Sequence, residues 1–345
     1  MRKEAFSFDS RDGETKLHAI RYLPDEGVPI RAVVQIVHGM SEYFERYEPF
    51  SRYLTEHGFV VTGDDHMGHG ESVAEGMTFG YFCRQDPATV LVRDEHRLKK
   101  ITQELFPGVP YLLIGHSMGS FIVRNYLCRY GTGISAAVLL GTGMPSRMEL
   151  FLSTTSAKAQ QLIFGPKHVA KLLDRLIFGG YNKRIKNPRT SYDWLTGEED
   201  LVDAYLRNPL CGFVFTLNGF LAMFQLISRI YQPDNLARIP KELPVLFASG
   251  DADPVGDYGK GVRAACESLE KAGMKHLTLK LYPGARHEVL NETNREEVYA
   301  DLLDWMERNA LSSPKQDRKS TRLNSSHKLT LISYAVFCLD RKSVV

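Results

Sequence analysis

The sequence predicts an α/β protein in which helices flank a mostly parallel sheet of eight strands. Short apolar segments rich in β-branched residues alternate with segments of helical spacing at both ends of the chain, as expected where helices connect parallel strands. The alternation stops near residue 145 and resumes near residue 239. With 345 residues, of which 43% are hydrophobic, the chain is long enough to bury a sizeable core. We therefore expect one sheet that is interrupted after its sixth strand by a helical insertion.

Six of the strands are expected before the insertion. Residues 3–8 and 15–23 alternate apolar and polar side chains on either side of the turn sequence DSRDGE, which predicts a hairpin. Four uniform apolar runs follow, as is typical of strands that are buried on both faces. These runs are RAVVQIVHG, FVVTGDD, VPYLLIG and ISAAVLLG. Helical spacing fills the intervals at 46–58, 86–105 and 120–131.

The middle of the chain has a different pattern. Residues 146–238 contain apolar helical stretches without a clean buried strand, so we expect them to form a helical cap. Strands at 243–250 and 276–284, each followed by a helix, then complete the sheet. The expected division is a core formed by residues 1–145 and 239–312, with the cap between its two parts.

Charge is unevenly spread along the chain. The formal net charge is +2, but residues 315–345 hold seven Lys and Arg against two Asp, so the rest of the chain is slightly acidic. This segment has no register with the preceding pattern and resembles translated adapter sequence, so we expect a non-native tail. The alternative is a native basic tail with a short membrane-surface segment. No basic patch with interleaved aromatic residues occurs, so nucleic acid is not an expected partner.

The expected location is the cytoplasm. The four cysteines before residue 315 are scattered and form no C-x-x-C pair, which is typical of reduced thiols. The first sixteen residues, MRKEAFSFDSRDGETK, lack the apolar centre of a signal peptide. The most apolar stretch, residues 211–231, is interrupted by polar side chains, so we expect a cap helix there rather than a membrane span.

The pentapeptide GHSMG, residues 115–119, lies between an expected buried strand and an expected helix. In a strand–turn–helix elbow the serine has a strained backbone, and only small residues fit two positions before and after it. The hydroxyl of Ser117 would then stand clear of the carboxyl edge of the sheet, next to the N-terminus of the helix. Ser117 is therefore the candidate nucleophile, and a purely structural turn is the alternative.

A serine nucleophile needs a base, and the base needs a carboxylate that orients it. In folds with this elbow, the acid and then the histidine follow the serine along the chain. The segment after the seventh expected strand offers Asp251, Asp253 and Asp257 as acids. The segment after the eighth offers His287 as the base, whereas His276 lies at the wrong end of that strand.

Acyl transfer also needs hydrogen-bond donors for the oxyanion of its tetrahedral intermediate. One candidate is the backbone N–H of Met118, which directly follows the nucleophile. The other is the N–H of Met40, in the loop after the third expected strand.

His66 and His69 form an H-x-x-H pattern, which raises the question of a metal. Glycines place the pattern in a loop and no third ligand is near in sequence, so we expect no metal site. The expected role is structural, with Asp65 and His66 bracing the site by hydrogen bonds. No phosphate-binding loop or dinucleotide fingerprint occurs, so no cofactor is expected.

Four motifs follow one another in an order that is typical of one enzyme family. The stretch HGMSEYFERYEPF carries an H-G-x-x-E-x-x-x-R-Y pattern at His38, Gly39, Glu42, Arg46 and Tyr47. DDHMGHGES, GHSMG and GDADPV follow it. Together they resemble the monoacylglycerol lipase and lysophospholipase branch of the α/β-hydrolases, which overlaps with serine aminopeptidases. The resemblance covers about residues 5–310.

The resemblance implies the α/β-hydrolase fold and a serine hydrolase that cleaves carboxylic esters of fatty acyl groups. Monoacylglycerols and lysophospholipids are the leading substrates that it implies. It favours Asp253 over Asp251, because the family aspartate precedes a variable dipeptide, and it implies that Glu42 and Arg46 form the polar end of the site near the alcohol. The chain departs from the family at Met40, which is larger than usual, and at the position after the second elbow glycine, which holds a serine.

The apolar cap predicts a site for an acyl chain. Phe213, Phe220 and Phe224 are the expected acyl-binding residues, and packing of the cap onto the core is the alternative. We also expect a transient contact of the cap with a membrane surface. The main rival function is an aminopeptidase with the same three catalytic residues, in which the acidic run GEED, residues 197–200, would hold a free amine. A weaker rival is a non-catalytic binding protein of the same fold.

Overall fold

The computed structural model of the protein describes residues 1–311, so the expected tail, residues 315–345, lies outside the described residues. The described strands form one sheet with the order β1-β2-β4-β3-β5-β6-β7-β8. β2 is antiparallel to both of its neighbours, and the strands from β4 to β8 are parallel. The mostly parallel eight-stranded sheet predicted from the sequence is confirmed. The strands are β1 (Arg2–Asp9), β2 (Lys16–Leu23), β3 (Ala32–Val37), β4 (Phe59–Asp64), β5 (Tyr111–His116), β6 (Ala136–Leu140), β7 (Val245–Gly250) and β8 (Leu277–Tyr282).

Alternate side chains of the central strands enter two hydrophobic cores, one on each face of the sheet. In β3, for example, Val33 belongs to one core and Val34 to the other. The first core is covered by α2 (Pro87–Leu105), α3 (Met118–Tyr130) and α9 (Lys260–Lys271). The second is covered by α1 (Glu48–Glu56) and α10 (Arg295–Met306), which a π-helical turn extends to Leu311. Because the parallel strands end at one edge, the loops after β3, β5, β7 and β8 meet there.

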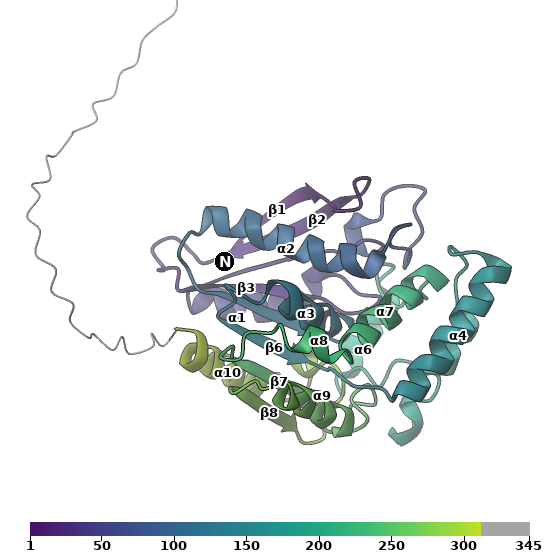
Figure 1. Ribbon diagram of the computed structural model, residues 1–345. Coiled ribbons are helices and arrows are strands. Elements are labelled where there is room, and N and C mark those ends of the chain that lie inside the picture. Colours follow the sequence, from purple (N-terminus) through teal and green to yellow (C-terminus); the bar gives the residue numbers. More distant parts are fainter. Residues whose placement is uncertain (312–345) are drawn as a thin grey trace, which may run out of the picture. The chain divides into compact units, whose positions relative to one another are not determined.

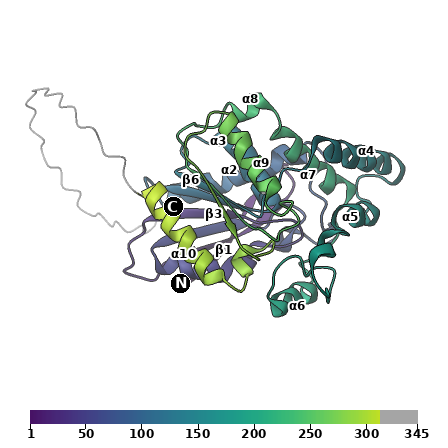
Figure 2. The same cartoon turned by 90° about the horizontal axis from the view of Figure 1, so that it is seen from below.

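Helices fill the interval between β6 and β7, so the predicted insertion after the sixth strand is confirmed. They are α4 (Arg147–Phe164), α5 (Lys171–Phe178), α6 (Glu199–Arg207), α7 (Leu217–Arg229) and α8 (Pro233–Leu236). Figures 1 and 2 show α4 to α7 gathered at one end of the sheet. The short helical turns of the chain are η1 (Phe44–Tyr47), η2 (Gly70–Ser72), η3 (Tyr181–Arg184) and η4 (Val289–Asn291).

The most apolar stretch of the cap differs from the expected continuous helix. α7 begins only at Leu217, because Thr216 is its N-cap and the Thr216 hydroxyl accepts from the Gly219 N–H at 3.3 Å. Thr216 also forms an antiparallel bridge with Val169. The residues before it are therefore an extended segment rather than the first turns of a helix.

Residues 1–311 belong to one compact unit, in which the cap packs with the sheet. The division into core and cap at residues 145/146 and 238/239 therefore stays a prediction. Within the described residues, no helix has both the length and the apolar character that crossing a bilayer requires.

Candidate active site

Ser117 lies at the turn between β5 and α3, at the carboxyl edge of the sheet. Its φ of 51° and ψ of −119° lie in a region that residues other than glycine rarely occupy. Its N–H donates to the carbonyl of Leu140 at 2.9 Å, which ties the turn to β6. Since α3 begins directly after it, the positive end of the helix dipole lies beside Ser117.

The two glycines of the elbow are required by close contacts. A Cβ atom on Gly115 would lie 2.5 Å from the carbonyl oxygen of Gly119. A Cβ atom on Gly119 would lie 2.0 Å from the carbonyl oxygen of Val37. The strained turn at Ser117 is therefore held by tight packing of β3, β5 and α3, as the sequence motif predicts.

His287 and Asp253 lie on the loops after β8 and β7 and form a buried pair. The Nδ1 atom of His287 is 3.0 Å from Oδ2 of Asp253, and the two residues are 2% and 0% exposed. The Asp253 carboxylate also accepts from the Val255 N–H at 2.8 Å and from the Ser249 hydroxyl at 3.2 Å. A carboxylate at Nδ1 selects the tautomer whose Nε2 lone pair can take a proton.

The other two carboxylates that the sequence offers lie outside this pair. Asp251 is exposed and accepts from the Gly284 N–H at 2.7 Å, and Asp257 is also exposed. Ser117 and His287 line the same cavity, but within the described chain no hydrogen bond joins them. Such bonds are often long in unliganded sites and tighten when substrate binds.

The loop after β3 offers the N–H of Met40 to the same cavity. The carbonyl of Gly39 accepts from Nδ1 of His38 at 2.8 Å, and Nε2 of His38 accepts from the His66 N–H at 3.0 Å. Burial and the neighbouring histidines hold the pKa of His38 well below its usual range, so the ring is neutral. Because a trans peptide directs its N–H opposite to its C=O, this contact turns the Met40 N–H away from His38. Among the described residues, neither this N–H nor that of Met118 has a protein acceptor.

Ser41, the residue after Met40, joins this loop to the cap. Its backbone has a positive φ of 57°. Its carbonyl accepts from the Gly212 N–H and from the Tyr205 hydroxyl, each at 3.0 Å. Its own hydroxyl donates to the carbonyl of Phe213 at 2.6 Å. Three hydrogen bonds therefore connect the loop that carries Met40 to the cap.

A cavity of about 1170 Å³ lies between the carboxyl edge of the sheet and the cap. Ser117, His287, Met40 and Met118 all contribute to its lining. Much of the remaining lining is apolar and comes from the cap, including Leu150, Leu173, Phe178, Trp194, Met223 and Phe224. A cavity of this size and character suits a large, mainly apolar ligand.

A sequence profile of the family described as "Serine aminopeptidase, S33" (Hydrolase_4) matches residues 28–294. The chain belongs to this family.

Relatives of this S33 protein include ester hydrolases. Monoglyceride lipase from Homo sapiens is 27% identical over 83% of this chain and 85% of its own length. Monoacylglycerol lipase from Mycolicibacterium smegmatis is 27% identical over 80% of this chain and 88% of its own. The crystal structure of a thermostable carboxyl esterase from Bacillus coagulans has a TM-score of 0.81 and 32% identity, covering 90% of this chain and 99% of that one. The S33 protein is therefore a carboxylic ester hydrolase with the α/β-hydrolase fold.

Two of the three phenylalanines expected to bind an acyl chain, Phe213 and Phe224, line the cavity of the S33 protein. The expectation for Phe220 is corrected. Its side chain is fully buried, with its ring centroid 5.8 Å from that of Phe215 and 6.0 Å from that of Phe224. These rings fill the space around Phe220, so it packs inside the cap and lies outside the cavity lining.

Three further residues near the proposed catalytic group were not singled out from the sequence. The ring of Trp194, in the cap, lies 5.2 Å from the ring of His287, measured between centroids. The sequence around Trp194 has no hydrophobic periodicity that would have pointed to it. His116 directly precedes Ser117, and Glu288 directly follows His287. Both residues line the cavity. Their adjacency to the two motif residues was the signal available.

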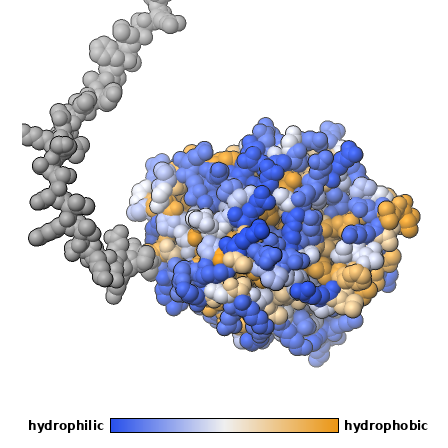
Figure 3. Space-filling view, in the orientation of Figure 1, coloured by the Kyte–Doolittle hydropathy of each residue, from blue (hydrophilic) through white to orange (hydrophobic). Residues whose placement is uncertain are grey.

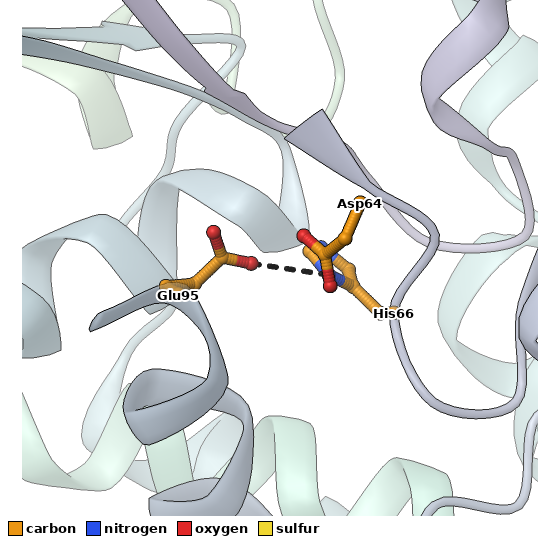
Figure 4. A group of neighbouring side chains, drawn as sticks. All are labelled: Asp64, His66 and Glu95. Carbon is orange, nitrogen blue, oxygen red and sulfur yellow. Dashed lines mark ion pairs between the residues drawn. The ribbon is translucent and has the colours of Figure 1, made fainter. Parts of the chain in front are cut away.

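Asp64, His66 and Glu95 are the described group whose atoms lie close enough to hold a cation (Figure 4). Nδ1 of His66 is 3.2 Å from Oε1 of Glu95 and 3.6 Å from Oδ2 of Asp64. Although burial opposes its charge, these carboxylates raise the pKa of His66 well above its usual range. The three side chains form an internal ion pair, and the expectation that this loop holds no metal stays a prediction.

The loop that contains this ion pair also braces the site, as the sequence predicts. Asp65 accepts from the backbone N–H groups of Phe44 and Glu71, each at 2.9 Å. His69, the second histidine of the H-x-x-H pattern, points elsewhere, because its Nε2 accepts from the Ser41 N–H at 3.3 Å.

Proposed function

We propose that the protein hydrolyses carboxylic esters of fatty acyl groups through an acyl-enzyme on Ser117, with monoacylglycerols and lysophospholipids as the leading substrates. The observation that carries the proposal is the buried His287–Asp253 pair, joined at 3.0 Å, whose histidine lines the same cavity as the strained Ser117. The two lipase relatives support the substrate class, since their names are monoglyceride lipase and monoacylglycerol lipase.

In the proposed reaction the Ser117 oxygen attacks the ester carbonyl and gives its proton to Nε2 of His287. The negative charge that develops on the carbonyl oxygen is stabilised by the N–H groups of Met40 and Met118. His287 then protonates the leaving alcohol, while Asp253 stabilises the imidazolium through Nδ1. Water, deprotonated by the same histidine, hydrolyses the acyl-enzyme and releases the acid.

The acyl chain is expected to lie among the apolar side chains that the cap contributes to the cavity. Each methylene buried there stabilises the complex by about 0.8 kcal/mol, which corresponds to about fourfold in kcat/KM. The cavity volume of about 1170 Å³ leaves room for several such steps.

The proposal includes a transient contact between the cap and a lipid surface. Large apolar side chains are exposed on α4 and α5, and Figure 3 shows the apolar patch at the end of the molecule where α4 lies. The most exposed are Leu162 at 90% and Ile163 at 74%. Exposed Lys158, Lys167 and Lys171 accompany them, a combination that suits an anionic lipid surface.

We keep the cytoplasm as the proposed location. The four cysteines of the described chain are unpaired, which supports a reducing compartment.

Amide hydrolysis is the second candidate, because the description of the family is "Serine aminopeptidase, S33". The acidic run expected to hold a free amine gives it little support, since the described residues 197–200 lie outside the cavity lining. Glu149, Asp174 and Asp257 do line the cavity and are carboxylates that could take this role.

A hydrolysis panel tests the proposal. It compares monoacylglycerols from acetyl to dodecanoyl with an aminoacyl amide, and uses Ser117→Ala as the control for background. We expect kcat/KM to rise about fourfold per methylene until the cavity is full, and Ser117→Ala to lower kcat by about 10⁴-fold while remaining folded. Equal rates on acetyl and decanoyl esters would contradict the lipid-ester assignment, and faster cleavage of the amide would favour the peptidase.

A further inference from the structure

A buried network of charged side chains touches three of the four loops that meet at the carboxyl edge of the sheet, namely those after β3, β5 and β8. Glu42 and Arg46 follow β3, His116 directly precedes Ser117, and Glu288 directly follows His287. Each member of the network is therefore at most a few residues from a group in the proposed mechanism.

Glu42 is the centre of this network. Its Oε1 atom accepts from the Gly39 N–H at 2.6 Å, from the Tyr47 hydroxyl at 2.8 Å and from Nδ1 of His116 at 3.1 Å. Its Oε2 atom accepts from Arg46. Both oxygens are thus occupied by protein donors, and the residue is only 3% exposed. A carboxylate in this state has little capacity left for the alcohol part of a substrate.

The contact with Gly39 bears directly on the oxyanion site. A Cβ atom on Gly39 would lie 2.6 Å from Oε1 of Glu42, so only glycine allows this approach. Glu42 holds the N–H of Gly39, and His38 holds its carbonyl. The peptide plane that carries the N–H of Met40 is therefore fixed from both sides.

Arg46 extends the network to the base. Its Nη1 and Nη2 donate to the two oxygens of Glu288 at 2.8 and 2.7 Å, a two-pronged contact of the strong kind. The Glu288 N–H donates to the Leu195 carbonyl at 2.7 Å, and Nε2 of His116 lies 3.4 Å from the carbonyl of His287. The loops of the nucleophile and of the base are thus joined through the same network.

Opposite charges face one another in the network. Although burial opposes ionisation, Arg46 holds the pKa of both Glu42 and Glu288 below its usual range. Burial also opposes the charge of His116, but the hydrogen bond that its ring donates to Glu42 raises the pKa of that imidazole overall. Two carboxylates therefore face a guanidinium and an imidazole whose protonation Glu42 favours. Removal of one member would leave a buried charge without its partner, which is costly.

We propose that Glu42, Arg46 and Glu288 are positioning residues, which hold the Met40 N–H and the loop of His287 in the geometry that ester cleavage at Ser117 requires. This inference rests on the proposed function. It is an alternative to the expectation that Glu42 and Arg46, which both line the cavity, form its polar end near the alcohol. The network acts before substrate arrives, so its effect should be the same for every leaving alcohol.

The test measures Glu42→Ala and Glu42→Gln on two esters of one acyl group, a glyceryl ester and a p-nitrophenyl ester. Glu42→Ala should lower kcat by about 10²-fold on both esters and leave KM within about threefold, because a misplaced oxyanion donor costs about that much. Glu42→Gln keeps an oxygen for the Gly39 N–H and should recover part of the loss. The rate at which a fluorophosphonate labels Ser117 should fall in parallel, since its phosphonyl oxygen uses the same donors.

The matched control is Glu48→Gln, which removes an exposed ion pair with Arg52 on α1 and should change neither readout. A loss confined to the glyceryl ester and seen in KM would show that Glu42 holds the alcohol and would overturn the inference, as would unchanged kcat and labelling. If Glu42→Ala does not fold, Arg46→Lys, which keeps the charge but loses the two-pronged contact, should give the same pattern. A wild-type protein that cleaves neither ester yet reacts with the fluorophosphonate contradicts the proposed function, and the labelling rates then decide the inference alone.

Discussion

At the scale of single residues, Asp253 forms a hydrogen bond with His287 and Asp251 does not. Asp253→Asn should lower kcat on a p-nitrophenyl ester by about 10⁴-fold, because an amide at Nδ1 favours the wrong tautomer of His287. Asp251→Asn should change kcat by less than about threefold, since that side chain is exposed and its hydrogen bond is to the backbone N–H of Gly284 rather than to His287. The reverse order of effects would move the role of the acid to Asp251.

Asp94 provides a test of pH dependence. Its carboxyl accepts from the Ser10 hydroxyl at 2.7 Å and from the Arg11 N–H at 2.6 Å, and burial raises its pKa to about 7. In the unfolded chain it titrates near pH 3.9. Between about pH 4 and pH 7 the folded state binds more protons, so this residue makes the free energy of unfolding fall as pH rises.

Asp94→Asn should therefore make the loss of stability between pH 4 and pH 7 shallower. The measurement is urea unfolding at several pH values in that window and at pH 8, where the dependence due to Asp94 has ended. The control is Asp200→Asn, which alters an exposed carboxyl and should keep the slope of the wild type. Identical slopes for Asp94→Asn and the wild type would show that Asp94 titrates normally in the folded state.

Residues in local motifs were predictable, and residues that depend on packing were not. Ser117 is identified by its elbow and His287 by its order after the seventh and eighth strands, which are both properties of nearby sequence. The contact of Glu42 with Gly39 is local too. Arg46, however, connects Glu42 to Glu288, which lies 242 positions after Arg46 in the sequence. The sequence could not show that Phe220 lies outside the cavity lining, because helical periodicity does not tell which neighbours cover a given face of a helix.

At the scale of elements, α4 and α5 expose an apolar face that should bind lipid. We expect Leu162→Glu combined with Ile163→Glu to weaken binding to vesicles of phosphatidylcholine and phosphatidylserine by tenfold or more, on the order of the loss from two buried side chains. The measurement is vesicle sedimentation. Hydrolysis of a short soluble ester should stay within about twofold of the wild type.

Leu105→Glu is the matched control for this experiment, because it places a charge at an exposed leucine on α2, away from the patch. It should leave vesicle binding unchanged. Equal binding by the wild type and the double variant would show that α4 and α5 are not a lipid-binding surface.

The elements of the core were easier to predict than those of the cap. Buried parallel strands are uniform apolar runs that end in glycine, so β3, β5, β6 and β7 stand out in the sequence. In the cap, α6 is short and amphipathic, and its surroundings give no clear start signal. The extended segment before α7 is apolar like the helix itself, and only its hydrogen bonds to Gly80 and Ala170 distinguish it.

At the scale of the whole molecule, residues 315–345 should contribute neither to folding nor to ester hydrolysis. The sheet and both of its helical layers lie within residues 1–311, and α10 already covers the last edge of the second core. Deleting residues 315–345 should leave the melting temperature within about 2 °C and kcat/KM within about twofold. A large fall in either quantity would show that this segment stabilises the fold.

The three hydrogen bonds of Ser41 have a consequence for how the molecule responds to ligands. Because they join the Met40 loop to the cap segment that contains Gly212 and Phe213, displacement of that segment should disturb the proposed oxyanion site. Thermodynamic linkage makes this relation reciprocal. If the cap binds lipid as proposed, a lipid surface that favours one arrangement of the cap should change the affinity of the site for the transition state. A bound transition-state analogue should then change the affinity of the cap for lipid by the same factor.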